Sequence, residues 1–203
     1  MSIRNTAAAW GLPARLLHWT MAVIMIGMLG LGFYTANVVT DLYVQFELVQ
    51  IHKSWGFVAF ALAILRVLWR AANPAPALPE GMAGWQVKAS HYSHYALYAL
   101  MFLMPLTGWL MSSASTLQEL YGVKNMVFGL FEMPDPFVPG SDGLESVFAT
   151  LHMVFAIALT AILLAHAGAA LKHHLIDKDD VMTRMTSGRA GGEAEGKSGA
   201  EAG

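Results

Sequence analysis

The stretch that decides the fold is Val147-FATLHMVFAIALTAILLAHAGAA-Leu171, which contains no Asp, Glu, Lys or Arg. The hydrocarbon core of a bilayer is about 30 Å thick, and a helix needs about 20 apolar residues to cross it. This stretch is long enough, and its ionisable side chains are His152 and His166 alone. It therefore predicts a membrane-spanning helix with two histidines in the apolar phase, where ionisable groups are costly and commonly functional.

Three further windows have the length and apolar character of a membrane span: Leu16 to Tyr34, Ile51 to Trp69 and Tyr92 to Met111. The second contains Lys53 and Arg66, which must snorkel to the surface or be paired inside the protein. Across the chain 56% of residues are hydrophobic and 13% are charged, against about 25% charged in soluble domains. The sequence thus predicts an all-α integral membrane protein, a four-helix bundle that contacts the lipid bilayer.

The domain organisation is simple, because the apolar segments are evenly spread and no linker divides them. We expect one transmembrane domain over residues 1–185. Residues 186–203, rich in Gly, Ala, Glu and Ser, should form a disordered tail. The first apolar window is not interpreted as a cleaved signal, because the apolar region of a signal is typically about 7–15 residues long.

Positive charges predict the orientation of the chain in the membrane. Ten of the twelve Lys and Arg residues lie in the N-terminal tail, around the second loop or in the C-terminal tail, and only Lys53 and Lys124 lie on the other side. Loops rich in Lys and Arg face the cytoplasm. Both termini should therefore be cytoplasmic.

The chain has no cysteine, which excludes disulfides, iron–sulfur clusters, thiolate zinc sites and the covalent attachment of c-type haem. A net charge of −2 gives no indication of nucleic-acid binding. Eight histidines remain as the metal-binding side chains of an apolar chain. They are the candidates for a functional site.

Helix geometry pairs four of these histidines at two depths. His152 and His166 are fourteen residues apart, nearly four turns, so they share a face and lie about 21 Å apart along the axis. With cytoplasmic termini, His18 lies at the inner level with His166, and His52 at the outer level with His152. Two histidines on facing helices can ligate a haem iron axially without covalent attachment. The sequence therefore predicts two b-type haems.

The same fourteen-residue spacing recurs on the other three helices, where the position that follows a histidine by fourteen is Gly32, Arg66 or Gly108. Glycine, here and at Gly56 one turn after His52, would leave room for a porphyrin edge, and Arg66 would pair with a haem propionate at the inner level. The alternative for the glycines is ordinary helix packing, because small residues are common where membrane helices meet.

The remaining histidines, His91, His94, His173 and His174, lie near the cytoplasmic ends of their helices. Interfacial anchoring is one explanation, since helix ends tolerate polar side chains. The other is a quinone site, to which His94 would contribute by its register and His173 by sharing a face with His166. Because the outer level has no spare histidine, this interpretation predicts electron flow from outside to inside.

The motifs together resemble the bacterial cytochrome b561 family over residues Pro13 to Met185. They are Arg15-Leu-Leu-His18-Trp19, His52-Lys-Ser-Trp-Gly56, Leu65-Arg66, Trp69-Arg70, His91-Tyr-Ser-His94, Pro105-Leu-Thr-Gly-Trp109, Leu151-His152 and the run from His166 to His174. The resemblance implies a multi-pass protein of the bacterial inner membrane, with two haems b ligated by His18, His52, His152 and His166.

The resemblance also implies an activity. Members of this family exchange electrons with ubiquinone, and some oxidise superoxide at the periplasmic face, whereas related cytochromes are membrane subunits of hydrogenases and formate dehydrogenases. We therefore expect an oxidoreductase that passes electrons from the periplasmic face, with superoxide as a candidate donor, to ubiquinone at the cytoplasmic side. The alternative is a membrane-anchor subunit that relays electrons for a periplasmic dehydrogenase or hydrogenase partner.

Two observations bear on these alternatives. The long outer loop is acidic and would repel an anion such as superoxide unless Lys53 and Lys124 dominate locally; its carboxylates are Glu119, Glu132, Asp135, Asp142 and Glu145. A modest outer loop and short tails favour a self-contained enzyme over a docking subunit, which needs an interface of about 1,000 Å² or more. A third possibility, a histidine-lined metal or proton carrier without haem, would lack the absorbance bands of a cytochrome.

Overall fold

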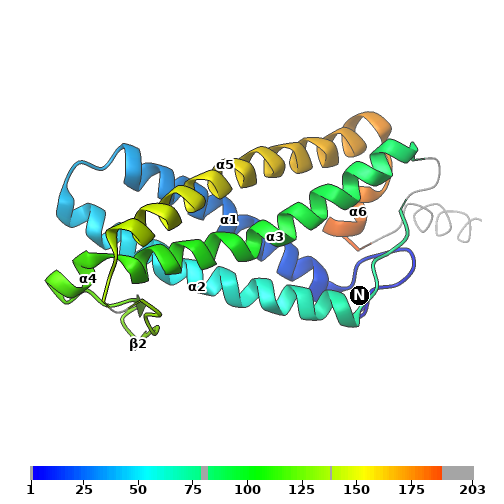
Figure 1. Ribbon diagram of the computed structural model, residues 1–203. Coiled ribbons are helices and arrows are strands. Elements are labelled where there is room, and N and C mark those ends of the chain that lie inside the picture. The colour runs from blue at the N-terminus through cyan, green and yellow to red at the C-terminus, as the bar shows by residue number, and fades with distance from the viewer. Residues whose placement is uncertain (1, 79–81, 138, 189–203) are drawn as a thin grey trace, which may run out of the picture. The chain divides into compact units, whose positions relative to one another are not determined.

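The computed structural model describes residues 2–78, 82–137 and 139–188. Within these residues four long helices are each apolar and long enough to cross a membrane (Figure 1). They are α1 (Leu12–Asn37), α2 (Leu42–Ala72), α3 (Gly84–Ala114) and α5 (Asp142–Lys172), and each contains one of the four predicted windows. The prediction of an all-α membrane protein with four spanning helices is confirmed, whereas the cytoplasmic placement of the termini stays a prediction.

The surface of these helices is apolar, as a lipid-facing surface must be. Large hydrophobic side chains are widely exposed, among them Val23, Phe33, Ile157 and Leu164, each between 65% and 70% accessible. A soluble protein rarely exposes apolar patches of this extent. In a bilayer the same side chains contact lipid, so the helices need only a small set of buried contacts with one another.

The described chain divides into two compact units. The first unit comprises Met1–Thr20, Leu65–Tyr95 and Ile162–Gly203, and the second comprises Met21–Ile64 and Ala96–Ala161. Each of the four long helices therefore contributes one segment to each unit. The prediction of a single domain over residues 1–185 stays a prediction, and residues 189–203 of the expected tail lie outside the described residues.

In the first unit, long-range hydrogen bonds tie the N-terminal segment to the C-terminal one. After Lys172 the chain continues through a π-helical turn, η1 (His173–Asp177), into the short helix α6 (Val181–Thr186). The Trp19 indole N–H donates to the Met185 carbonyl at 3.1 Å, and the Arg184 guanidinium donates to the Ala77 carbonyl at 2.8 Å. The end of the described chain is thereby held against α1 and the loop after α2.

In the second unit, the loop between α3 and α5 has structure of its own. It contains the short helix α4 (Thr116–Tyr121) and a hairpin of two short strands, β1 (Met126–Val127) and β2 (Phe131–Glu132), paired antiparallel. Asn125, which precedes β1, is fully buried. The sequence indicated a long, acidic loop here; its two strands were not predicted.

Candidate functional site

The second unit brings the imidazole rings of His52 of α2 and His152 of α5 close together. The centroids of the two imidazole rings are 6.3 Å apart, and the ring planes are inclined at 76°. Both side chains are partly buried. This is the pair that the helix register predicted for the outer level.

Backbone and hydroxyl oxygens of α3 orient the ring of His152. Its Nδ1 lies 3.1 Å from the carbonyl oxygen of Met104 and 3.2 Å from Oγ1 of Thr107. The Thr107 hydroxyl donates its hydrogen to the Leu103 carbonyl at 2.7 Å, which leaves its oxygen free to accept. Because a carbonyl can only accept, Nδ1 of His152 carries the proton, and Nε2 keeps the lone pair that a metal needs.

Two glycines define the space for these rings. A Cβ at Gly32 would lie 3.2 Å from Cε1 of His52, and a Cβ at Gly108 would lie 3.1 Å from Cε1 of His152. Both distances are tighter than most real contacts of a Cβ atom. The sequence suggested that these glycines make room for a porphyrin edge; in the structure that space is taken by the imidazoles. At Gly56 a Cβ would make only ordinary contact, 3.8 Å from Cε of Met28.

The first unit brings His18 of α1 and His166 of α5 together with the same spacing, 6.3 Å between ring centroids at an inclination of 55°. A guanidinium nitrogen of Arg66 lies 3.0 Å from Nδ1 of His18. The ring of His94 lies 5.4 Å from that of His166. The structure therefore gathers around the inner pair both of the other residues that the fourteen-residue spacing assigned to this level.

The spacing of both pairs fits axial ligation of one iron by two imidazoles. A bond between a metal ion and an imidazole nitrogen is about 2.0 to 2.1 Å long, and that nitrogen lies about 1.2 Å from its ring centre, so two axial imidazoles place their centroids about 6.5 Å apart. Each pair shows 6.3 Å. Four histidines in two pairs of equal spacing are what two haems b would require.

The contact between Arg66 and His18 has a consequence for such ligation. A guanidinium has only donors, so Nδ1 of His18 accepts, and the ring proton then lies on Nε2. If Nε2 of His18 ligates iron, Nδ1 must carry the proton, and Arg66 must turn away from it. The predicted pairing of Arg66 with a haem propionate would require the same movement.

At the end of α5, His173 forms a cluster with two carboxylates. Its Nδ1 lies 2.5 Å from Oδ2 of Asp179 and 3.2 Å from Oδ2 of Asp177, and its side chain is 12% accessible. Lys172 donates to both carboxylate oxygens of Asp177, at 2.8 and 2.6 Å. The sequence predicted His173 but not Asp177 or Asp179; their spacing of four and six residues from His173 was the available signal. His91 and His174 are exposed.

Lys53 is held inside the second unit by the loop. Its ammonium donates to Oδ1 of Asn125 at 3.1 Å and to Oγ of Ser112 at 3.4 Å, and the Asn125 amide in turn donates to Asp135. The sequence required Lys53 to snorkel or be paired, and this network pairs it. Asn125, the residue that makes this possible, was not recognised in the sequence.

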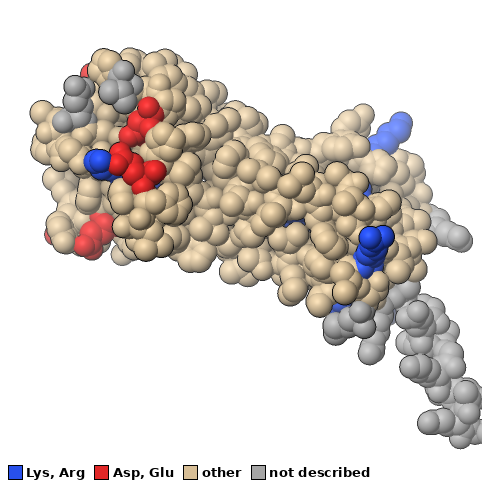
Figure 2. All heavy atoms as spheres, turned by 90° about the horizontal axis from the view of Figure 1, so that it is seen from below, with Lys and Arg blue, Asp and Glu red and all other residues tan. Residues whose placement is uncertain are grey.

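Lys124, the other basic residue of the second unit, forms an ion pair with Glu132 at 2.6 Å. The hydrogen bond to Glu132 and its negative charge raise the pKa of Lys124 above its ordinary value. Acidic side chains also gather on part of the face drawn in Figure 2. The charge of Lys124 is thus compensated by Glu132, whereas the direct partners of Lys53 are the neutral oxygens of Asn125 and Ser112.

Membrane-spanning helices that bring histidines together in pairs, at a spacing that suits two ligands of one metal ion, are typical of one class of protein, the b-type membrane cytochromes. The family model described as "Prokaryotic cytochrome b561" matches residues 9–188, and the chain belongs to this family. Membership places it in the bacterial inner membrane as a multi-pass, haem-b electron-transfer protein.

Two relatives of known sequence come from Escherichia coli (strain K12). Cytochrome b561 homolog 2 is 32% identical over 189 residues, which cover 91% of this chain and 95% of the relative. Cytochrome b561 homolog 1 is 27% identical over 173 residues, which cover 83% of this chain and 92% of the relative. The similarity therefore extends over nearly the whole length of both relatives.

Proposed function

We propose that this chain is a dihaem cytochrome that passes electrons from the periplasmic face of the inner membrane to ubiquinone at the cytoplasmic side. The observation that carries the proposal is the equal spacing, 6.3 Å between ring centroids, of the two histidine pairs. His52 and His152 would hold one haem, and His18 and His166 the other. A haem iron, when bound, supplies a carrier that takes up and releases one electron.

The residues around the outer pair prepare it for ligation. The hydrogen bonds that His152 makes to the Met104 carbonyl and to Thr107 fix its tautomer, and an N–H that donates in this way makes the other ring nitrogen a stronger ligand. Gly32 and Gly108 admit the two rings to their positions. These features act before any metal is present, so the site is preorganised.

The residues around the inner pair suit quinone reduction. Reducing a quinone takes two electrons and two protons, so its site needs an electron donor nearby and groups that carry protons. His94 lies against His166, and His173 donates from Nδ1 to Asp179, which leaves Nε2 of His173 available to a second hydrogen-bond partner. We therefore place ubiquinone near His94 and His173.

The test of the ligand assignment is the haem content of four single variants. His18→Ala and His166→Ala should each lose one haem, and His52→Ala and His152→Ala should each lose the other, because an iron with one axial histidine is held less firmly. Pyridine haemochrome assay gives the stoichiometry, and low-temperature α-band spectra distinguish the two haems. Depletion of the same haem by His18→Ala and His152→Ala would show that the pairing is wrong.

The electron donor is a separate question. Superoxide is the candidate that the family resemblance suggests, but Lys53 and Lys124 are both engaged by oxygen atoms of the second unit. Ubiquinone reduction by the purified protein, supplied with an enzymatic source of superoxide and with superoxide dismutase as control, tests this donor directly. A rate that superoxide dismutase does not lower would exclude it.

A further inference from the structure

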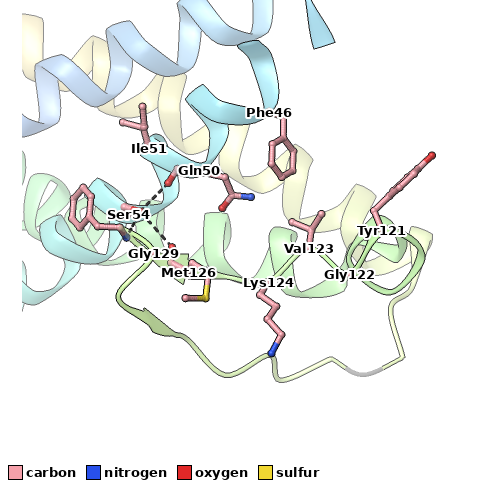
Figure 3. A pocket seen from close by; sticks show the side chains of 11 residues that line it. Phe46, Gln50, Ile51, Ser54, Tyr121, Gly122, Val123, Lys124, Met126 and Gly129 are labelled. Carbon is pink, nitrogen blue, oxygen red and sulfur yellow. Dashed lines mark hydrogen bonds between the residues drawn. The ribbon is translucent and has the colours of Figure 1, made fainter. Parts of the chain in front are cut away.

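The second unit contains a cavity of about 630 Å³, which we call the outer cavity (Figure 3). It lies between the first half of α2 and the loop that runs from Tyr121 to Gly129. Its lining includes Phe46, Gln50, Ile51 and Phe128. Ligand pockets typically enclose about 300–1,000 Å³, are mostly apolar and carry a few polar groups that fix orientation.

One polar group in the outer cavity lacks a partner. Oε1 of Gln50 is buried and accepts no hydrogen bond from any described residue, and Figure 3 shows the Gln50 side chain among those that line the cavity. A buried unsatisfied acceptor is costly, so native proteins rarely leave one without a function or a missing partner. Oε1 therefore indicates a ligand that donates an O–H or N–H.

Two other polar side chains of the lining, Ser54 and Lys124, have partners already. Oγ of Ser54 donates to the backbone carbonyl of Gln50 at 2.9 Å and accepts from the backbone N–H of Phe128 at 2.9 Å. The ammonium of Lys124 is paired with Glu132. Within the described lining, the buried acceptor that lacks a hydrogen-bond partner is thus the side-chain oxygen of Gln50.

The wall of the outer cavity includes a strained aromatic residue. Phe128 has φ of 49°, in the left-handed region that a bulky side chain seldom adopts. It is held there by its N–H bond to Ser54 and by edge-on packing of its ring on Trp55, with centroids 5.6 Å apart. Residues kept in such conformations cluster at ligand clamps and active sites.

Charge restricts the ligand further. The sequence of the second unit contains seven Asp and Glu residues but only Lys53 and Lys124 as positive charges. Because the carboxylates of this unit outnumber its lysines, an anionic ligand would meet net repulsion, whereas a neutral one would not. A neutral, largely apolar ring that carries a hydroxyl group meets all three conditions of volume, apolarity and hydrogen-bond donation.

We propose that the outer cavity binds a neutral dihydroxyaromatic reductant of the hydroquinone class, whose hydroxyl donates to Oε1 of Gln50. This inference rests on the proposed function and names its electron donor. The hydroquinone breaks two O–H bonds, releases two protons to the outer side and gives up two electrons, one at a time, to become a quinone. Ubiquinone at the other end takes up two electrons and two protons, so the donor must have the lower midpoint potential, as naphthohydroquinones do.

The test uses the purified haem-containing protein under anaerobic conditions, with menadiol as the probe. Binding is measured by titration calorimetry on dithionite-reduced protein, in which no electron can be accepted and binding alone is observed. Gln50→Leu should weaken menadiol binding about tenfold or more, since it removes a buried hydrogen bond. Gln45→Leu is the matched control, because Gln45 lies on the same helix but bonds to the Thr35 carbonyl at 3.2 Å.

Phe128→Ala provides a second variant, checked by its α-band spectrum for intact haem sites, and should also weaken binding. Equal affinities of Gln50→Leu and the wild type, or failure of menadiol to bind the wild type, would overturn the proposal. Loss of binding in His94→Leu but not in Gln50→Leu would move the ligand to the inner site and overturn it as well.

The acceptor half-reaction separates this inference from the proposed function. Pre-reduced wild-type protein, freed of reductant, should be reoxidised when it is mixed with decylubiquinone. A wild-type protein that binds menadiol but is not reoxidised by decylubiquinone would leave the outer cavity in place and refute the proposed function. A wild-type protein that is reoxidised by decylubiquinone but does not bind menadiol would refute the proposed ligand of the outer cavity and leave the proposed function in place.

Discussion

At the scale of the residue, His152 shows how backbone atoms can tune a metal ligand. Met104 and Thr107 both accept from the single hydrogen on Nδ1. Each such bond makes the imidazole more electron-rich and favours the oxidised form of an iron bound to its other nitrogen. Thr107 is 5% accessible, so solvent cannot readily replace its hydroxyl.

Replacement of Thr107 by valine should raise the midpoint potential of the outer haem. A hydrogen bond contributes about 0.5–1.5 kcal/mol net, and a tenfold change in a one-electron equilibrium, about 1.4 kcal/mol, corresponds to 59 mV, so the rise should be about 20–60 mV. Potentiometric titration followed in the α-band measures it, with Thr107→Ser as the variant that keeps the hydroxyl. A shift of the inner haem, or of neither, would contradict this role.

Arg66 should have the opposite effect on the inner haem. Its positive charge, next to His18 and available to a propionate, favours the reduced form, so Arg66→Leu should lower the inner midpoint potential more than the outer one. Arg66→Lys keeps the charge and should shift the potential less. Arg70→Leu is a control on the same helix, since the Arg70 guanidinium lies 5.8 Å from the ring centroid of Trp10. Equal shifts of both haems would argue against the placement of Arg66.

At the scale of the element, the long helices and their register could be predicted because length, apolarity and a fixed rise per residue determine them. Fourteen-residue spacing placed Gly32 and Gly108 at the level of His52 and His152, where the structure has them. The register could not say what fills the space beside each glycine. That depends on the rotamers of the histidines, which pack only in the folded protein.

Gly32→Ala and Gly108→Ala should therefore displace the ring of His52 or His152, because the added methyl would come within 3.2 Å of an imidazole carbon. The expected result is a loss of outer-haem content or a change in its low-spin spectrum, with the inner haem retained. Gly30→Ala serves as the matched control on α1, since a Cβ there would meet nothing within 4 Å. Equal haem content in all three variants would show that the rings can shift without loss.

The structure of the loop between α3 and α5 could not be predicted from the sequence, for a physical reason. Its hairpin turns through Phe128 at positive φ, a position that turn rules assign to glycine, asparagine or aspartate. The compensation comes from Ser54 and Trp55, more than seventy residues earlier in the chain. The cluster of His173 with Asp177 and Asp179 was also not predicted. The π-helical turn that brings these residues together has no periodic signature in the sequence.

At the scale of the whole molecule, each of the two units contains one histidine pair, and the surroundings of the pairs differ. The outer pair is accompanied by acceptors for a ring proton and by no further histidine, whereas the inner pair is accompanied by a guanidinium and by His94. Acceptors favour the oxidised state of a ligated iron and a cation favours the reduced state. The two sites should therefore differ in potential, with the inner one higher, which makes electron flow from the outer site to the inner one downhill.

This direction predicts which residues control the acceptor reaction. His94→Leu and His173→Leu should slow the reoxidation of pre-reduced protein by decylubiquinone about tenfold or more, since general acid–base groups commonly contribute about 10²–10⁴ in rate. Asp179→Asn should slow it less, because it leaves His173 in place and removes only the carboxylate that orients the ring at 2.5 Å. His174→Leu is the neighbouring control, because it changes the residue next to His173. Haem content and reduction of the outer haem should stay normal in all four variants, as stopped-flow spectra in the α-band can establish. Should His94→Leu and His173→Leu both be reoxidised at the wild-type rate, quinone is reduced elsewhere, and electrons need not run from the outer pair to the inner one.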